Sequence, residues 1–471
     1  MREDSAKVVV VGAGLAGLSA AEVLSSQSDF RVDSVVVLEA ASELGGRIQN
    51  VAGLAPWPVE IGPEFLHGTQ NSSVKKLVDE MGCVQRELNF HILQNARENM
   101  LHELFKALVE ENSSVPDMSI AEYLQKKGVS ETVMGLAEAI YGNDFGCSLD
   151  KLGLYECIQE ANQWIYGDTY IILDRPLSSV VNYISRNLHV LVNWAVKQVE
   201  QLRNGDLRLH SHDGRTLRAQ YVILTVPVTI LQQKLISFLP PLPESKIRAA
   251  EAIGMSNVMK VVMAFSQRFW PRDMFDVVCS HCFLPEVWMT EYPKSEVSSP
   301  SEDHKDRDSS DHVPLGNYIV VGFIAGDRAS KVAKMSEVEI LRQSLTQLDR
   351  MFGTAEVCTS SNSKVSGRVF LRKDVVKSSR YDSTQSHPAS SFFSGGVIVN
   401  WADRSFIRGG YSHPSVNAGG ARRELAKPVG NIFFAGEATH PGVNPCLQAA
   451  IDTGRRAAHE VIGASKRRSA L

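Results

Sequence analysis

The sequence predicts an α/β protein that begins with a Rossmann-like nucleotide-binding unit, on three observations. Residues 7–11 form a β-branched run typical of a buried parallel strand. The motif Gly12-Ala13-Gly14-Leu15-Ala16-Gly17 follows it and opens an Ala/Leu-rich helix to about residue 24. A second strand, residues 34–38, ends in Glu39, an acid at the spacing expected of a dinucleotide site.

Each residue of this unit has a physical role. Gly12 permits the tight turn, Gly14 lets the backbone approach a pyrophosphate, and Gly17 lets the helix pack on the strand. Glu39 can accept hydrogen bonds from both hydroxyls of a ribose. Because the strand, the helix and the spaced acid agree, they favour a dinucleotide site over a coincidental glycine-rich turn.

The segment Leu44-Gly45-Gly46-Arg47 indicates which dinucleotide. In nicotinamide enzymes the chain usually continues here as another βα unit. A Gly-Gly-Arg turn can instead wrap the same pyrophosphate, with the guanidinium neutralising its charge. This favours a flavin over a nicotinamide.

The rest of the chain alternates between two kinds of structure. Helical periodicity over residues 72–138 predicts a helical cap. Residues 190–226 are predicted to be rich in β-strands, with a hairpin turn at Asp213-Gly214. Residues 255–265 and 317–324 favour strands of a second sheet. Near the end, a strand at 431–435 precedes a helix that starts near Pro445.

We therefore predict a Rossmann-like cofactor domain interleaved with an α+β substrate domain that has a helical cap and a mixed or antiparallel sheet. The cofactor domain comprises residues 1–70, 180–250 and 395–471. The substrate domain comprises residues 71–179 and 251–394. Residues 291–311, rich in Ser, Asp and Glu, are predicted to be a mobile loop.

Composition excludes several classes. The chain has 471 residues, of which 44% are hydrophobic, enough for a large core. Its net charge of -4 argues against a basic nucleic-acid-binding domain and equals the net charge of the loop at residues 291–311. We expect no membrane span, because no apolar stretch is long enough.

The seven cysteines are odd in number and mostly isolated, so we predict a cytoplasmic protein without a disulfide framework. Cys279-Ser280-His281-Cys282 has CxxC spacing, but no second pair stands at metal-ligand distance. We interpret it as incidental and predict no metal site. His440 is assigned to the turn that shapes the cofactor pocket.

Several blocks together resemble the flavin-dependent amine oxidase superfamily. Beyond the N-terminal motifs they are residues 61–68 (Ile-Gly-Pro-Glu-Phe-Leu-His-Gly), 257–260 (Asn-Val-Met-Lys), Trp401, Gly410-Tyr411 and the segment from residue 434 to Leu447. Their order is kept from residue 8 to about residue 462. Residues 141–144 and 170–181 look similar to plant cytosolic polyamine oxidases that act on spermine and thermospermine.

The resemblance implies a bound FAD. Monoamine oxidases carry a flavin-binding cysteine where this chain has Gly410, so we infer that the FAD is noncovalent. The positions implied to contact it are Gly12, Gly14, Ala16, Gly17, Glu39, Gly46, Arg47, Gly62, Val199, Glu437 and Leu447.

It also implies two catalytic residues. Lys260 matches the family lysine that holds a water against flavin N5. Pattern alone fits a strand lysine facing solvent equally well. His67 matches a histidine of the animal enzymes, where a neutral imidazole can accept a proton or orient the amine. By composition alone a single histidine is more often structural.

Four substrate-binding residues follow. Trp401 and Tyr411 match the aromatic walls beside the substrate carbon, with core packing the competing interpretation for Trp401. Glu64 is given a substrate-positioning role. Cys446 stands where many polyamine oxidases have an aromatic residue, which leaves the substrate preference open.

The predicted function is that of a monomeric FAD-dependent polyamine oxidase with O2 as acceptor and H2O2 as product. Carboxylates available to anchor distal ammonium groups are Asp144, Glu156, Glu160 and Asp174. A histone-demethylase-like or other amine oxidase is the first alternative; the demethylase is disfavoured because only six residues precede the predicted strand at 7–11 and no long coiled helical insertion interrupts the sequence. A flavin-binding protein without turnover is the second. The preferred polyamine and the C–N bond cleaved stay open.

Overall fold

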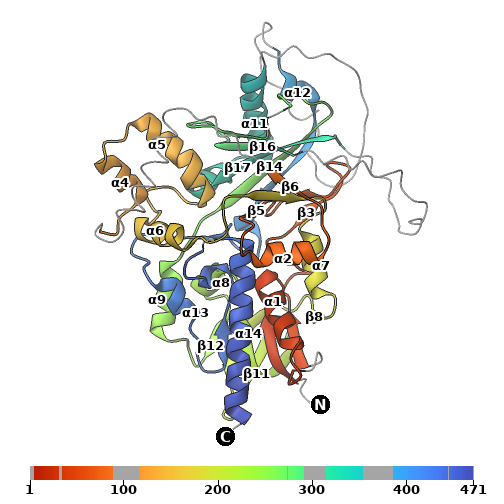
Figure 1. Cartoon of the computed structure of the whole chain (residues 1–471), viewed down its shortest axis with the longest axis vertical. Coiled ribbons are helices and arrows are strands. Elements are labelled where there is room, and N and C mark those ends of the chain that lie inside the picture. Colours follow the sequence, from red (N-terminus) through yellow and green to blue (C-terminus); the bar gives the residue numbers. More distant parts are fainter. Residues whose placement is uncertain are drawn as a thin grey trace, which may run out of the picture.

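The computed structural model describes residues 5–30, 34–88, 116–272, 274–290, 315–353, 386–443 and 445–469. The loop predicted at residues 291–311 lies outside these ranges. Figure 1 shows two main layers: a sheet with two long helices in the lower half, and a second sheet in the upper half with a group of helices at its side. This is the α/β architecture that the sequence predicts.

The first sheet has a parallel centre. β1 (Ser5–Val11) lies between β2 (Val35–Leu38) and β11 (Thr216–Leu224), and all three run in the same direction. Its consecutive valines are buried, as expected of a strand covered on both faces. The remaining strands of this sheet are β8 (His189–Leu191), β9 (Val196–Gln201), β10 (Leu207–Ser211), β12 (Ser237–Leu239) and β20 (Ile432–Phe434).

The register brings four strand ends to one edge of this sheet. Val11 is opposite both Leu38 and Leu224, and Leu224 is opposite Phe434. In open parallel sheets, ligands bind beyond the carboxyl ends of the strands. The segments that begin at Gly12, Glu39, Thr225 and Ala435 therefore meet where a dinucleotide is expected.

Two helices pack closely on this sheet. α1 (Leu15–Ser25) crosses α14 (Leu447–Ser469) at Gly454, where a Cβ atom would lie 2.1 Å from the carbonyl oxygen of Ala16. Only glycine permits this approach. α7 (Ser178–Ser185) joins the same hydrophobic core through Val180, Val181 and Ile184.

The second sheet is antiparallel and buried on both faces. Its order is β15 (Asp276–Val278), β16 (Glu286–Thr290), β17 (Tyr318–Ala325), β14 (Val258–Phe265) and β18 (Phe393–Asn400). β14 and β17 confirm the strands predicted at 255–265 and 317–324. α11 (Glu337–Phe352), α10 (Gly326–Val332) and α12 (Pro388–Phe392) lie beside this sheet.

Smaller elements surround these layers. The helical cap consists of α4 (Ile120–Lys126), α5 (Glu131–Ala137), a π-helical turn (Glu138–Gly142) and α6 (Leu154–Gln163), at the left of Figure 1. The predicted cap was too long at its start, because α2 (Ser73–Glu80) packs beside α14 in the core of the first sheet through Val74, Leu77 and Val78. A small sheet has the order β5 (Leu66–His67), β7 (Tyr170–Leu173), β6 (Gln85–Leu88). The other short elements are β3 (Asn50–Val51), β4 (Val59–Glu60), β13 (Gly254–Met255), β19 (Ser412–His413), α8 (Val228–Gln232), α9 (Glu244–Ala252) and α13 (Ala421–Ala426).

The predicted domain boundary at residue 395 needs adjustment. The third segment of the cofactor domain, predicted to begin at residue 395, starts inside β18, which pairs with β14 of the second sheet. We propose that this segment begins after Asn400. Among the described residues, no helix has both the length and the apolar character needed to cross a bilayer.

Candidate active site

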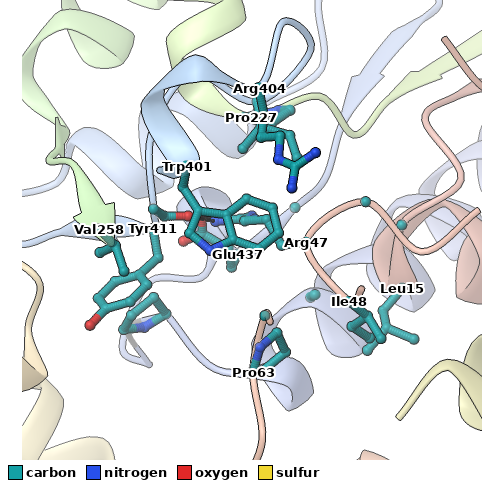
Figure 2. A pocket seen from close by; sticks show the side chains of 18 of the residues that line it. Leu15, Arg47, Ile48, Pro63, Pro227, Val258, Trp401, Arg404, Tyr411 and Glu437 are labelled. Carbon is teal, nitrogen blue, oxygen red and sulfur yellow. Dashed lines mark hydrogen bonds and ion pairs between the residues drawn. The ribbon is translucent and has the colours of Figure 1, made fainter. Parts of the chain in front are cut away.

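One cavity of about 1480 Å³ contains most of the predicted site residues. Its walls come from the carboxyl edge of the first sheet, from β14, β16 and β17 of the second sheet, and from the helical cap. Figure 2 shows Arg47, Trp401, Tyr411 and Glu437 around one part of it. Sites for a single small ligand are typically about 300–1,000 Å³, so this cavity has room for a dinucleotide and a second ligand.

Two glycine turns meet at the dinucleotide end. Gly45 N donates to Ala13 O at 2.9 Å, which joins the two turns. A Cβ on Gly17 would lie 1.9 Å from Gly12 O, so Gly17 sets the packing of α1 on the first turn. A Cβ on Gly14 would meet only Gly45 O at 3.9 Å. Gly12, Gly14, Ala16, Gly46 and Gly62 line the cavity, whereas Gly17 lies behind it.

Glu39 is held by backbone groups at the end of β2. Its two carboxylate oxygens accept from Ala13 N at 2.8 Å and Ala41 N at 2.9 Å. These bonds fix the carboxylate on the cavity wall, where the remaining lone pairs can accept from a ribose. This arrangement fits the adenosine half of FAD.

Arg47 contacts a second part of the site. Its Nη1 donates to Glu437 Oε1 and to Gly410 O, both at 3.0 Å. Burial opposes ionisation of Glu437, but Arg47 and Arg422 outweigh it and lower the pKa of Glu437. The ion pair therefore ties the Gly-Gly-Arg turn to the segment after β20, with both residues on the cavity wall.

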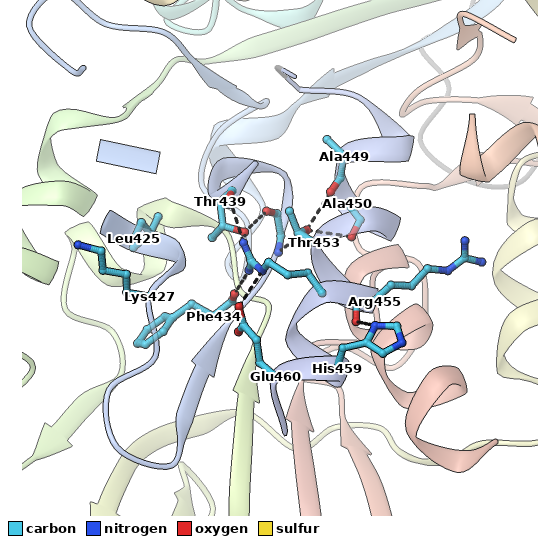
Figure 3. Close-up of polar contacts among 12 residues, drawn as sticks. Leu425, Lys427, Phe434, Thr439, Ala449, Ala450, Thr453, Arg455, His459 and Glu460 are labelled. Atoms are coloured by element: carbon cyan, nitrogen blue, oxygen red, sulfur yellow. Dashed lines mark hydrogen bonds and ion pairs between the residues drawn. The ribbon is translucent and has the colours of Figure 1, made fainter. Parts of the chain in front are cut away.

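α14 fixes that segment from below. Thr453 Oγ1 accepts from Gly436 N at 3.1 Å and donates toward the carbonyls of Ala449 and Ala450 in its own helix (Figure 3). Arg456 donates to the carbonyls of Phe434 and Thr439. Since Glu437 lies between these anchors, its position is set by the helix. Leu447, the first residue of α14, also lines the cavity.

Val199 is placed differently from the other predicted cofactor contacts. It is 1% exposed, lies in the hydrophobic core of the first sheet and does not line the cavity. Val196, at the start of the same strand, lines the cavity together with Trp194 and Ala195. We therefore propose Val196 in place of Val199 as the cofactor contact.

Lys260 is a buried lysine on β14, not a strand lysine facing solvent. Its Nζ donates to Gly62 O at 2.6 Å and lies 3.6 Å from Glu64 Oε2. Burial lowers the pKa of Lys260, while Glu64 and Glu60 oppose that shift. Lys260 and Glu64 both line the cavity.

The second sheet orients Glu64. The carboxylate accepts from Trp288 Nε1 at 2.8 Å and from Thr290 Oγ1 at 2.6 Å. Both donors are on β16. With its oxygens engaged in this way, Glu64 acts in the structure as a partner of Lys260.

Trp401 and Tyr411 lie on the cavity wall, where Figure 2 shows them close together. Trp401 is 3% exposed and packs in the core beside β14. It is therefore both a core residue and part of the cavity wall. It occupies a 3₁₀ turn (Trp401–Asp403) after β18. Tyr411 donates its hydroxyl to Asp144 O at 2.8 Å, which ties this wall to the helical cap.

His67 is half-buried on β5 and lines the cavity. Its ring meets Tyr170 edge-on, with 4.7 Å between the ring centroids. Burial lowers the pKa of His67, and Asp144 opposes that shift. The ring is therefore neutral at pH 7 and able to accept a proton. Cys446 also lines the cavity, next to Trp164, and burial raises the pKa of its thiol.

The four candidate anchors separate into two groups. Asp144 and Glu160 line the cavity. Glu156 instead accepts from Gly420 N, and Asp174 pairs with Arg175 at 3.0 Å. The sequence interpretation missed Glu286, which lines the cavity from β16. Glu286 lies on the strand that follows the CxxC segment, and no motif in the neighbouring sequence indicates that it belongs to a site.

The two remaining motifs stay outside the site. Cys279 and Cys282 are free thiols in the turn between β15 and β16. No group of residues suited to a metal ion occurs within the described ranges. His440 does not line the cavity, and burial lowers its pKa to about 4.

This site and fold define a flavin-dependent amine oxidase. Residues 129–462 match the family described as "Flavin containing amine oxidoreductase", and residues 10–81 match an "NAD(P)-binding Rossmann-like domain". The chain belongs to the flavin-containing amine oxidoreductase family.

Its relatives are of two kinds. The chain is 24% identical to "Probable polyamine oxidase 4" of Arabidopsis thaliana, over 92% of this chain and 82% of that protein. It is also 24% identical to "Lysine-specific histone demethylase 1 homolog 2" of Oryza sativa subsp. japonica, over 98% of this chain and 58% of that protein. A redesigned putrescine oxidase structure shares the fold, with a TM-score of 0.74 at 17% identity, covering 98% of this chain and 100% of that one.

The cofactor is FAD, bound noncovalently. The two docked glycine turns, the cavity-facing carboxylate of Glu39 and a cavity too large for one small ligand all fit it. Gly410 offers no thiol for a covalent bond. Similarity alone does not separate a polyamine substrate from a methylated lysine.

Proposed function

We propose that this protein is a polyamine oxidase that acts on spermine or thermospermine. The observation that carries the proposal is the lining of the substrate part of the cavity. Carboxylates of Asp144, Glu160 and Glu286 face the same space as buried aromatic and aliphatic side chains. Such a space suits a ligand with several ammonium groups on an apolar chain.

Bound FAD would supply the oxidation, as the acceptor of a hydride from the carbon next to a secondary amine, with O2 taking up the two electrons to give H2O2. The resulting imine hydrolyses to a shortened amine and an aminoaldehyde. Names of relatives such as "Polyamine oxidase 2" of Arabidopsis thaliana support this substrate class.

The chain's own residues prepare the substrate. A ring nitrogen of the neutral His67 can accept the proton of the reacting ammonium, which frees the nitrogen lone pair. Trp401 and Tyr411 flatten the space around the reacting carbon. The ammonium of Lys260, fixed by Gly62 and Glu64, can hold a water molecule at the cavity wall.

We also propose that the enzyme is a monomer in the cytoplasm. The described cysteines are all free thiols, which supports a reducing location.

Product analysis tests the proposal. Incubation of the purified holoenzyme with spermine or thermospermine in air should give H2O2, a shortened amine and an aminoaldehyde, identified by mass spectrometry. The products also identify the C–N bond that is cleaved. Formaldehyde from a dimethyl-lysine histone peptide, without turnover of either polyamine, would instead support a demethylase.

A further inference from the structure

Glu286 and Lys260 stand in one register row of the second sheet. Lys260 on β14 is opposite Phe323 on β17, and Phe323 is opposite Glu286 on β16. All three residues line the cavity. Neighbouring strands lie about 4.8 Å apart, so Lys260 and Glu286 are separated by on the order of 10 Å across Phe323.

The carboxyl group of Glu286 is held in place and is close to a second one. Its Oε2 accepts from Asn143 Nδ2 at 2.7 Å. Asp276, on the adjacent strand β15, has a buried Oδ1 without a hydrogen-bond partner among the described residues. Burial raises the pKa of Asp276 to about 7 and that of Glu286 well above its ordinary value, and Asp276 and Asp144 raise the pKa of Glu286 further.

Asp144 supplies an independent observation on the same space. Asp144 lines the cavity and is accessible there, and desolvation raises the pKa of its carboxyl group, while His67 opposes that shift. It interacts electrostatically with Glu286. Lys260, which also lines the cavity, is already engaged by Gly62 and Glu64. Carboxyl groups that face one another in a poorly solvated space are costly to ionise unless a bound cation completes the site.

We propose that Glu286 is a specificity-determining residue that anchors a distal ammonium group of the substrate, with Asn143 orienting its carboxylate and Asp144 beside the bound cation. The inference rests on the proposed function, because it places the reacting amine next to Lys260. The register row then sets the distance between the reacting nitrogen and the second cation. The ring of Phe323 contacts the methylene groups between them.

This arrangement predicts selection by charge spacing. Amines with a second positive charge on the order of 10 Å from the reacting nitrogen should bind best. For monoamines, which have no second charge, Glu286 should not increase the binding affinity. Selection should therefore appear in KM and in binding affinity more than in the maximal rate.

The test compares the wild-type holoenzyme with Glu286→Gln, which keeps the side-chain shape but removes the charge. Spermine, a series of linear diamines of increasing length and hexylamine serve as probes. The KM for spermine should rise by at least about tenfold in the variant, since a hydrogen bond to a charged group is lost. The preference among diamine lengths should disappear, and values for hexylamine should not change.

Glu138→Gln is the matched control. Glu138 is a half-buried carboxylate of the helical cap that accepts from Leu149 N at 3.0 Å and does not line the cavity. Its substitution should leave all KM values unchanged. Thermal melting of each variant identifies any loss of folding. If Glu286→Gln does not fold, Glu286→Asp should shift the preferred diamine length upward by one methylene.

The outcomes separate the inference from the proposed function. An unchanged KM for spermine in Glu286→Gln, or an unchanged length preference in Glu286→Asp, overturns the role of Glu286 while polyamine oxidation stands. If no amine is oxidised by the wild type, the proposed function fails. Calorimetric titration of the holoenzyme with the diamines then decides the role of Glu286, since equal affinities of wild type and variant overturn it.

Discussion

The ammonium of Lys260 lies 3.6 Å from the carboxylate of Glu64, and both side chains are buried. The two residues come from different parts of the fold: Glu64 follows β4, and Lys260 lies on the central strand pair of the second sheet. A charged pair in the interior is rarely a gain in stability by itself. Because the pair lies on the cavity wall, we propose that it has a role in catalysis.

Replacement of Lys260 tests that role. We expect Lys260→Met to slow flavin reduction by about 10²-fold or more while FAD stays bound, because a positioned polar group at the reacting centre is lost. Rapid-mixing spectroscopy under anaerobic conditions measures the rate. Loss of FAD at an unchanged rate per bound flavin would show that Lys260 belongs to cofactor binding.

Lys246→Met is the matched control. Lys246 is equally buried, but its ammonium donates to the carbonyls of Glu424 and Leu425 at 2.7 and 2.9 Å, far from the cavity lining. We expect this substitution to lower the melting temperature and to leave the rate of flavin reduction unchanged.

Glu60 gives a pH-dependent prediction. One oxygen accepts from Leu177 N at 2.6 Å, and Oε2 has no partner among the described residues. Burial raises its pKa to about 8, so the folded chain keeps a proton that the unfolded chain loses near pH 4.5. Stability should therefore fall as pH rises from about 4.5 to about 8, by at most ~1.4 kcal/mol per pH unit from this group.

Glu60→Gln should remove that contribution. Urea unfolding at several pH values measures it. Between pH 5 and 8, the free energy of unfolding of the variant should increase relative to that of the wild type. Parallel curves for the two proteins would contradict a protonated Glu60.

The glycine motif gives a paired prediction. Gly17→Ala would place a Cβ 1.9 Å from Gly12 O and should disrupt folding. Gly14→Ala meets only Gly45 O at 3.9 Å, so the chain should fold with weakened FAD binding. Circular dichroism and the flavin content after purification distinguish the two effects. Full flavin content in Gly14→Ala would contradict a close approach of the cofactor to Gly14.

Polyamine binding should release protons. The pKa of Glu286 is raised well above its ordinary value and that of Asp276 to about 7, and a bound ammonium should lower both, so that protons held by these carboxyl groups leave on binding. The other groups that face Glu286 are Asp144, Lys260, Tyr170 and Tyr411. Calorimetry in two buffers of different ionisation enthalpy should detect the release at pH 7 and its reduction in Glu286→Gln. A binding enthalpy independent of buffer would contradict it.

The sequence predicted those features that depend on local order. The Gly12 to Glu39 unit needs one strand, one turn and one helix in fixed succession, and the structure has β1, α1 and β2 there. Lys260 was harder to place, since β14 is buried on both faces and has no alternation to show which side chains face a cavity. Only the family resemblance favoured a buried position for Lys260 at the site over a position facing solvent.

Glu286 could not be found in this way. Its importance comes from register, because Lys260, Phe323 and Glu286 are brought together by two antiparallel pairings between distant segments. The placement of Val199 depends on tertiary structure too. Only the first residue of β9, Val196, lines the cavity, whereas Val199 lies in the core of the first sheet, and a single sequence does not show where along a strand the cavity begins.

Anaerobic addition of spermine to the purified yellow holoenzyme tests the central claim most directly. A polyamine oxidase should lose its visible flavin absorbance at a rate that saturates with spermine concentration, and admission of air should restore the band. A flavin spectrum that stays unchanged with spermine, thermospermine and every diamine tested would contradict polyamine oxidation by this protein.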